Sequence, residues 1–387
     1  MSTNRKPGRP LRRCLRRFVR FFLACFVLLL VLIGVEIIAG WRCDLQGEIP
    51  APVPQPSARK SVVAGIKDYA RPEDDAYLSL PEWYIVWSYQ EKADSQKFNR
   101  PSAFPYFGAV RQYWSNYCCI SRLTRRKYGF NAGEQVMLVV IGNSFSAEYI
   151  LKGLYEKTIG RLSEWTAGDY PSTEEDNYAY RVARDYADFV HIRPFYEFQF
   201  ARRVKGLWSA NHLWGAHLLR KWERRVFLTA DYAIEAFYCW VIEKGTHLSY
   251  GYEPDQTYVW LENVDDAPLQ QIPQAKVVKS AGPRAAIVVA PRYQPFTSVA
   301  LALAQHGGHF VEIAGNSSIT ISVLAPQSWG GEIRAAGGPV AQRLFSLPLL
   351  TRPGWQRVVL RCDVLALDRA LNALASDGVM VEHVYDY

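Results

Sequence analysis

Three side chains of the types used in acyl transfer lie near the middle of the chain. Ser144 follows the apolar run Val139-Val-Ile-Gly-Asn, and Asp188 and His191 stand three positions apart farther along. A histidine beside a serine can accept the hydroxyl proton as general base, and a nearby carboxylate can orient its imidazole ring. Ser144, Asp188 and His191 are therefore the candidate catalytic residues.

The Gly-Asn-Ser block that ends at Ser144 resembles the nucleophile block of SGNH-type esterases and acyltransferases, and residues 188–191 resemble their Asp-x-x-His block. The resemblance implies an envelope hydrolase or acyltransferase in which His191 is the base for Ser144. That fold places several βα units between the two blocks, whereas about 45 residues separate them here.

The residues around Ser144 also fit a helix from Asn131 to about Trp165. Asn131 and Glu134 have the spacing of an N-terminal cap. The charged i,i+4 neighbours in this run are Glu148, Lys152 and Glu156. In such a helix the serine hydroxyl would donate to the preceding turn instead of facing a base. The sequence leaves both interpretations open.

The same run predicts a polar and aromatic helix face. Its members are Glu148, Tyr149, Tyr155, Glu156 and Arg161. Such a face can bind a ligand or a partner helix, and it is also typical of a solvated ladder of ion pairs.

Two pairs of histidines have spacing that invites a metal interpretation. His306 and His309 flank two glycines, which also suit the end of a helix. His212 and His217 are five positions apart, on different faces of a helix. No P-loop, GxGxxG, HExxH or CxxCH motif occurs in the sequence. We therefore expect neither a metal site nor a cofactor.

The excess positive charge lies next to the most apolar segment of the chain. The net charge is +8, and eight cations and no acid fall in residues 1–20, so the remaining 37 basic and 37 acidic residues balance. Nucleic-acid binding requires a positive field on a folded face, so this distribution argues against that class. A basic arm beside an apolar segment instead sets membrane orientation.

Residues 21–41 are predicted to form a transmembrane helix. The 19 residues from Phe21 to Ala39 carry one charge, Glu36, and can cross a hydrocarbon core of about 30 Å. A cleaved signal peptide, the main alternative, usually has a shorter apolar region. We expect a single-pass anchor in a cell inner membrane, with residues 1–20 cytoplasmic and the domains after the helix periplasmic or otherwise extracytoplasmic.

Cysteine usage fits that location without forming a disulfide framework. Seven cysteines are present. Those after the predicted anchor are Cys43, Cys118, Cys119, Cys239 and Cys362. An extracytoplasmic compartment permits disulfides, but an odd set with one adjacent pair predicts one bridge at most.

A linker and a helical domain follow the anchor. Residues 42–78 contain alternating prolines and are predicted to be an extended spacer from the bilayer. Residues 79–252 have helical periodicity, many Trp and Tyr residues, and capping patterns that begin at Ser79, Asn131 and Ser172. The last long helix, 225–247, is amphipathic and suits a membrane surface.

The remaining segment, 255–387, contains an internal repeat. Residues 284–313 and 357–384 each have the pattern strand, helix, glycine and strand. Two βαβ halves about a pseudo-two-fold axis resemble the ferredoxin-like fold, here with an insertion near residues 327–338. The expected class is α+β: an anchor, an aromatic-rich helical domain and a ferredoxin-like α/β sandwich.

These features favour a non-enzymatic function. We expect a single-pass accessory or scaffold protein whose outer region binds a protein partner in the membrane or envelope, with the lipid bilayer as its other partner. Two alternatives stay open: the hydrolase or acyltransferase that uses Ser144, Asp188 and His191, and a lipid- or glycan-binding module built on the aromatic residues.

Overall fold

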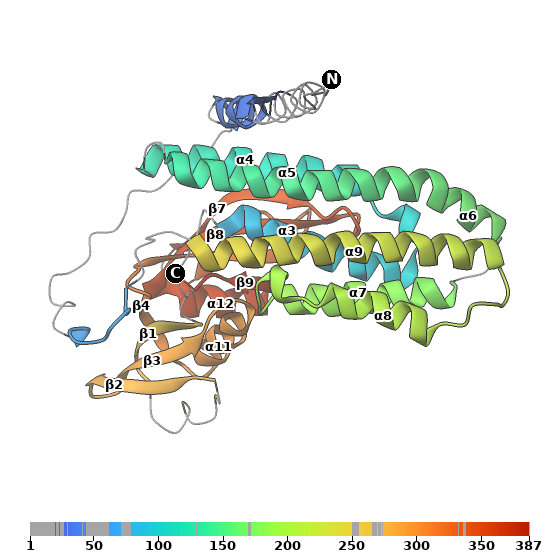
Figure 1. The fold of residues 1–387 in the computed structure, drawn as a ribbon. Helices are drawn as coiled ribbons and strands as arrows, with labels where there is room; N and C mark the ends of the chain where they lie inside the picture. Colours follow the sequence, from blue (N-terminus) through green and yellow to red (C-terminus); the bar gives the residue numbers. More distant parts are fainter. Residues whose placement is uncertain are drawn as a thin grey trace, which may run out of the picture.

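The computed structural model describes residues 30–40, 62–70, 79–128, 131–168, 172–249, 255–264, 274–331, 333–335 and 338–386, together with a few single positions. Nearly all of the predicted basic arm and the alternating prolines 50–56 lie outside this part of the chain. The described residues form a helical domain and two antiparallel sheets, which confirms the predicted α+β class (Figure 1).

The helical domain consists of long helices that run side by side (Figure 1). They are α3 (Leu80–Phe98), α4 (Tyr106–Tyr128), α5 (Ala132–Tyr155), α6 (Arg161–Thr166), α7 (Glu174–Val190), α8 (Phe200–Ala210) and α9 (Leu218–Ser249). The short helical turns are η2 (Pro101–Ala103), η3 (Glu156–Gly160) and η4 (Phe195–Glu197). Because η3 is a π-helical turn between α5 and α6, the helix predicted from Asn131 to about Trp165 is present with one irregular turn.

The predicted caps are only partly right. Asn131 caps α5, where its side chain accepts a hydrogen bond from the Glu134 amide. The cap predicted at Ser172 lies one residue later, because Thr173 and Asp176 form the reciprocal capping box of α7. If Ser172 were the N-cap, the Glu175 side chain would complete the capping box. Its carboxylate is instead buried and accepts a hydrogen bond from Arg225 of α9. At the start of α3, Ser79 occupies the N-cap without a side-chain capping bond.

Aromatic rings build much of the helical core. Tyr84, Phe145 and Tyr149 are buried and meet at tilted or edge-on angles, with centroid separations of 4.2 Å for Phe145–Tyr149 and 6.2 Å for Tyr84–Phe145. Helices α4 and α5 approach closely because Gly142 faces the ring of Tyr113, where a Cβ atom would clash. Many of the aromatic residues counted in the sequence are therefore core residues.

The C-terminal region contains two copies of one unit, as the repeat predicts. The first unit is β1 (Gln256–Glu262), β2 (Lys276–Gly282), β3 (Ala285–Pro291), α11 (Gln294–Gln305) and β4 (His309–Ile313). The second is β5 (Ser318–Pro326), β6 (Ile333–Ala335), β7 (Gly338–Pro348), β8 (Trp355–Asp363), η5 (Val364–Ala366), α12 (Leu367–Ser376) and β9 (Met380–Val384). In each unit, one strand (β1 or β5) lies antiparallel between the two strands that the helix connects.

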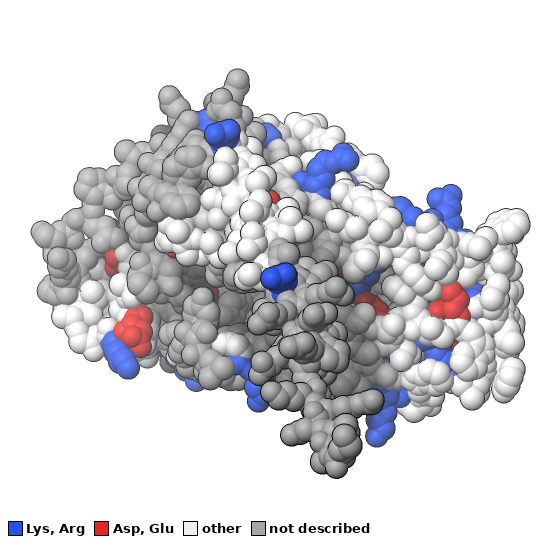
Figure 2. Space-filling view, turned by 45° about the horizontal axis from the view of Figure 1, so that its top comes forward, with Lys and Arg blue, Asp and Glu red and all other residues white. Residues whose placement is uncertain are grey.

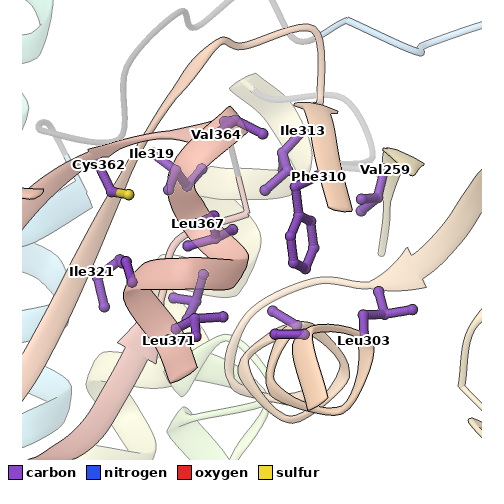
Figure 3. Close-up of a cluster of buried hydrophobic side chains, with 14 of the residues drawn as sticks. Val259, Leu303, Phe310, Ile313, Ile319, Ile321, Cys362, Val364, Leu367 and Leu371 are labelled. Carbon is purple, nitrogen blue, oxygen red and sulfur yellow. The ribbon is translucent and has the colours of Figure 1, made fainter. Parts of the chain in front are cut away.

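The predicted single ferredoxin-like sheet is wrong, because the two units form separate sheets. Their strand orders are β2-β3-β1-β4 and β6-β7-β8-β5-β9. In each unit the position between the two helix-connected strands is filled by a strand of the same unit, β1 or β5, and not by a strand of the other unit. The units meet instead through α11 and α12, whose side chains share one core with residues of both sheets (Figure 3).

The second sheet rests on the helical domain through buried charge and aromatic contacts. Arg357 of β8 donates hydrogen bonds to Glu91 of α3 at 3.0 Å and to Glu382 of β9 at 2.6 Å, and it lies over the Trp87 ring. Nearby, the Trp83 ring lies 3.7 Å from the His383 ring, centroid to centroid. Helical domain and sheet therefore share one interface.

The C-terminal end of the first helix is docked on α4 and α5. Within residues 30–40, the Glu36 carboxylate accepts a hydrogen bond of 2.6 Å from the Asn143 amide of α5. Gly40 lies against the ring of Tyr117 on α4. Among the residues that the structure describes, no helix is both long and apolar enough to cross a membrane.

One disulfide fastens this helix to α4. It joins Cys43 to Cys118, with the two Cα atoms 5.7 Å apart. The described cysteines that remain as thiols are Cys119, Cys239 and Cys362. The finding agrees with the expectation of one bridge at most.

Candidate functional site

Helix α9 turns its charged side chains into the protein. Arg220, Lys221, Arg224 and Arg225 have side chains that are 1–6% exposed. Their ion pairs are Arg220–Asp176 at 2.8 Å, Lys221–Glu175 at 3.3 Å, Arg224–Glu156 at 2.7 Å and Arg225–Glu175 at 2.6 Å. Buried charges require such partners, so these pairs bind α9 to α7 and to the π turn after α5.

A second charge cluster lies farther along α9. The Lys152 ammonium of α5 is 2.7 Å from Glu148, 3.0 Å from Asp231 and 3.0 Å from Glu235. Burial by itself lowers the pKa of Lys152, but the three carboxylates outweigh that effect and hold the pKa well above its ordinary value. Burial raises the pKa of Glu235 to about 7. Three acids thus compete for one buried cation.

A small polar cavity of ≈ 50 Å³ adjoins this cluster. Lys92 lines it, with its ammonium 6.0 Å from the Tyr106 ring centroid and 5.9 Å from that of Tyr149. Burial, and then the charge of Lys152, lowers the pKa of Lys92. The cavity has room for a few water molecules, which is too small for a sugar ring or an acyl chain.

The opposite side of α9 is apolar and faces outward. Val226, Ile234, Phe237 and Trp240 are 55–66% exposed, and their spacing places them on one face. An amphipathic helix in a globular protein normally has the reverse arrangement, with its apolar stripe inside. Helix α9 is therefore inverted, with buried charges and exposed hydrophobic side chains.

Helix α5 also exposes a row of large hydrophobic side chains, while its buried side includes Leu138, Phe145 and Tyr149. Its exposed large hydrophobic residues are Val136, Met137, Val140, Ile150, Leu151 and Leu154. In the C-terminal half of α5, the charged residues Glu148 and Lys152 face α9 instead. Figure 2 shows the side of the molecule that carries α4 and α5. Much of the described surface on this side is formed by residues other than Lys, Arg, Asp and Glu.

Helices α5 and α9 run antiparallel and contact each other through the side chains of Lys152 and Tyr155 (Figure 1). Lys152 meets Glu235, and three residues later the Tyr155 ring stacks on Phe227 at 3.9 Å, so the numbering rises on α5 as it falls on α9. The Tyr155 hydroxyl also donates to Glu223 at 2.6 Å. Helix α5 packs on α4 and α3, and α9 packs on α8 and α7. The exposed apolar rows of α5 and α9 are together named here the α5–α9 face.

The buried contact between α5 and α9, behind the apolar face, explains the polar and aromatic side predicted on the helix from Asn131. Tyr155 and Glu156 contact α9, and Glu148 binds Lys152 while it accepts a hydrogen bond of 2.6 Å from the Tyr89 hydroxyl. The partner helix that the sequence left open is therefore α9 of the same chain. The ladder is buried instead of solvated.

Ser144 lies on α5, whereas the other two candidate catalytic residues, Asp188 and His191, lie at the C-terminal end of α7. The Ser144 hydroxyl of α5 donates to the Val140 carbonyl at 3.1 Å, as expected for a serine within a helix. Asp188 of α7 pairs with Arg184 at 3.1 Å. The Nδ1 atom of His191, at the C-cap of α7, is 2.6 Å from the Ala187 carbonyl oxygen. Ser144 also has a side-chain hydrogen bond with Tyr238 of α9, and the His191 carbonyl accepts one from the Gln294 amide. None of these described hydrogen bonds joins the three residues to one another.

The histidine pairs have separate partners. His306 Nδ1 is 2.8 Å from the Ala302 carbonyl oxygen, and His309 Nδ1 is 3.3 Å from Asp368. His212 lies 3.0 Å from Glu174 at the surface. Within the described residues, no group of three or more His, Cys, Asp and Glu side chains is arranged to hold a metal ion.

The basic run of α9 is the functional feature that sequence reasoning missed. Residues 220–225 contain four cations, and residues 174–176 are three consecutive acids. Two short runs of opposite charge in a neutral body are a signal for pairing between segments. Recognising that pairing would have led to the prediction that the charged side of α9 is buried and its apolar side is exposed.

The comparisons with known proteins give no assignment: no family model, no curated protein and no solved structure matches this chain.

Proposed function

We propose that this chain is a membrane-anchored accessory or scaffold protein that acts by binding through the α5–α9 face. The observation that carries the proposal is the row of exposed hydrophobic side chains on each helix, behind which the charged side chains of α9 are buried. Exposed hydrophobic surface of this extent marks an interaction site in a soluble protein. The ion pairs behind it fix both helices, so the face is already formed before anything binds to it.

The location of the face supports the membrane part of the proposal. Asn143, which binds Glu36, lies one helical turn from Val140 of the face. The apolar run 21–39 and the basic arm before it favour a membrane anchor. The disulfide between Cys43 and Cys118 suits a compartment outside the cytoplasm.

Footprinting of the full chain in native membranes tests this proposal. A water-borne radical or carbene reagent should modify Leu151 and Phe237 several-fold less than Val278, because something covers the face. Val278 of β2 is the matched control, since it is an exposed apolar side chain outside the helical domain. Equal modification at all three positions would show that the face is open to water and would overturn the proposal.

The lipid-binding alternative is favoured by the same face, since its exposed residues are aliphatic or aromatic.

The hydrolase alternative is tested with a Ser144→Ala variant of the full chain, assayed with generic ester substrates. Loss of a measurable turnover on that substitution would favour it.

A further inference from the structure

We infer that the occupant of the α5–α9 face is the lipid bilayer itself, with α5 and α9 lying along its surface. This inference rests on the proposed function, because it names what the binding face binds. The argument uses the composition of the face, the direction of the first helix and the position of the buried charges.

The composition of the face suits lipid better than a protein partner. From Val136 to Leu154 the outward row of α5 contains aliphatic residues with Ser144 and Ala147 between them, and no charge. Protein interfaces carry a polar rim and on average one hydrogen bond for each 100–200 Å². Acyl chains need neither, so an uncharged row about 28 Å long is the surface that they cover best.

Aromatic and basic side chains border this face. Trp165 and Trp240 are exposed at its ends, and Lys157 and Arg161 are exposed beside the continuation of the α5 row. Trp favours the boundary between acyl chains and headgroups, and Lys and Arg can extend from an apolar surface to lipid phosphates. The border thus has the composition of a helix pair that rests in the headgroup region.

The first helix leaves the domain on the same side. Cys43 and Gly40 contact α4, whereas Glu36, farther back along the helix, contacts α5 at Asn143. The chain therefore crosses from α4 onto α5 as it runs back toward its N-terminus. Ile33 and Ile37 pack against the helical core, whereas Leu30 and Leu28, still farther back, are exposed. A helix that enters a membrane in this direction brings the α5–α9 face to that membrane.

The buried charges determine how deep the two helices lie. Lys152, Asp231 and Glu235 stand on the inner side of the pair, where the rest of the domain covers them. A spanning orientation would carry this cluster to the bilayer centre, where ionised groups are costly. Lying along the surface leaves the cluster in protein and immerses only the outer row, to about 5–10 Å.

The test uses the full chain with a photo-crosslinking diazirine amino acid at Leu151 or Ile234, both exposed on the face, and at Val278 as control. The samples are native membranes and proteoliposomes of phosphatidylcholine with phosphatidylglycerol. Mass spectrometry identifies what each position captures. We expect phospholipid adducts at Leu151 and Ile234 in both samples, and at Val278 only reaction with water.

The other outcomes separate the two proposals. Adducts with a protein at Leu151 and Ile234 in native membranes, with water adducts in proteoliposomes, would overturn the bilayer inference and leave the proposed binding face standing. Water adducts at every position in both samples would overturn the inference and the proposed function together.

Discussion

Lys152 is the cation shared by three largely buried carboxylates, so its removal should lower the stability of the protein far more than removal of an exposed lysine. In a Lys152→Met variant, Glu148, Asp231 and Glu235 lose their shared cation. We expect a loss of about 3–5 kcal/mol in the free energy of unfolding, measured by chemical denaturation. The control Lys244→Met changes an exposed lysine of the neighbouring helix α9 and should cost less than about 0.5 kcal/mol. Similar values for the two variants would contradict the assigned cluster.

Glu235 should make stability depend on pH in a defined direction. Its pKa is raised from 4.5 to about 7 in the folded protein, chiefly by burial. Between these values the folded state binds more protons than the unfolded state, so the free energy of unfolding falls as pH rises from 4.5 to 7. A Glu235→Gln variant lacks this contribution and should gain on the order of 1–3 kcal/mol relative to the parent at pH 8.

Thermal denaturation of the parent protein and of the Glu235→Gln variant between pH 4.5 and 8 measures this difference in stability. The exposed carboxylate Glu262 of β1 supplies the control variant Glu262→Gln, which should follow the parent protein at every pH. Parallel curves for the parent and Glu235→Gln would mean that Glu235 is not the titrating group.

At the scale of elements, the spacing of α4 and α5 depends on one glycine. A Cβ atom at Gly142 would collide with the Tyr113 ring, whereas at Gly133, in the first turn of α5, its nearest neighbour would be 3.6 Å away. We expect Gly142→Ala to destabilise the protein by about 1–3 kcal/mol, although alanine favours helix by about 1 kcal/mol. Gly133→Ala should be neutral or stabilising. Equal effects in denaturation experiments would argue against the close approach of the two helices.

The elements themselves were largely predictable, because local patterns determine them. The Asn131 cap, the helix through Ser144 and the repeated strand–helix–strand units all follow from spacing along the chain. The number of sheets did not follow, since it depends on which edges of β1 and β5 are filled by strands distant in sequence. The ion pairs of the basic run of α9 were missed for a similar reason: its acid partners lie on other elements.

The candidate site was less predictable than the fold. Amphipathic spacing marks two sides of α9 but does not say which side is buried. Burial was decided by Arg224 and Arg225, whose partners Glu156 and Glu175 lie on other elements. The Ser144 motif, by contrast, was visible in the sequence, and its described hydrogen bond is the one that a helical serine makes.

At the scale of the whole molecule, the redox state of Cys43 and Cys118 tests whether the domains after the first helix lie in an oxidising compartment. Peptide mapping of the full chain, alkylated in native membranes without reductant, should find Cys43 linked to Cys118 and Cys119 alkylated only after unfolding. Burial raises the pKa of Cys119 to about 11, so little thiolate is present to exchange with the neighbouring bridge. Free, alkylated Cys43 and Cys118 would indicate a reducing compartment and the opposite membrane orientation.

The Cys43–Cys118 bridge also changes what the proline-alternating stretch 50–56 does mechanically. The bridge stands before that stretch in sequence and fastens the first helix directly to α4. Residues 43–118 therefore form a covalent ring closed by the disulfide, and the stretch lies within it. Tension applied at the N-terminus passes through the sulfur atoms into α4 and bypasses the prolines, so a protease nick among them would leave both fragments joined.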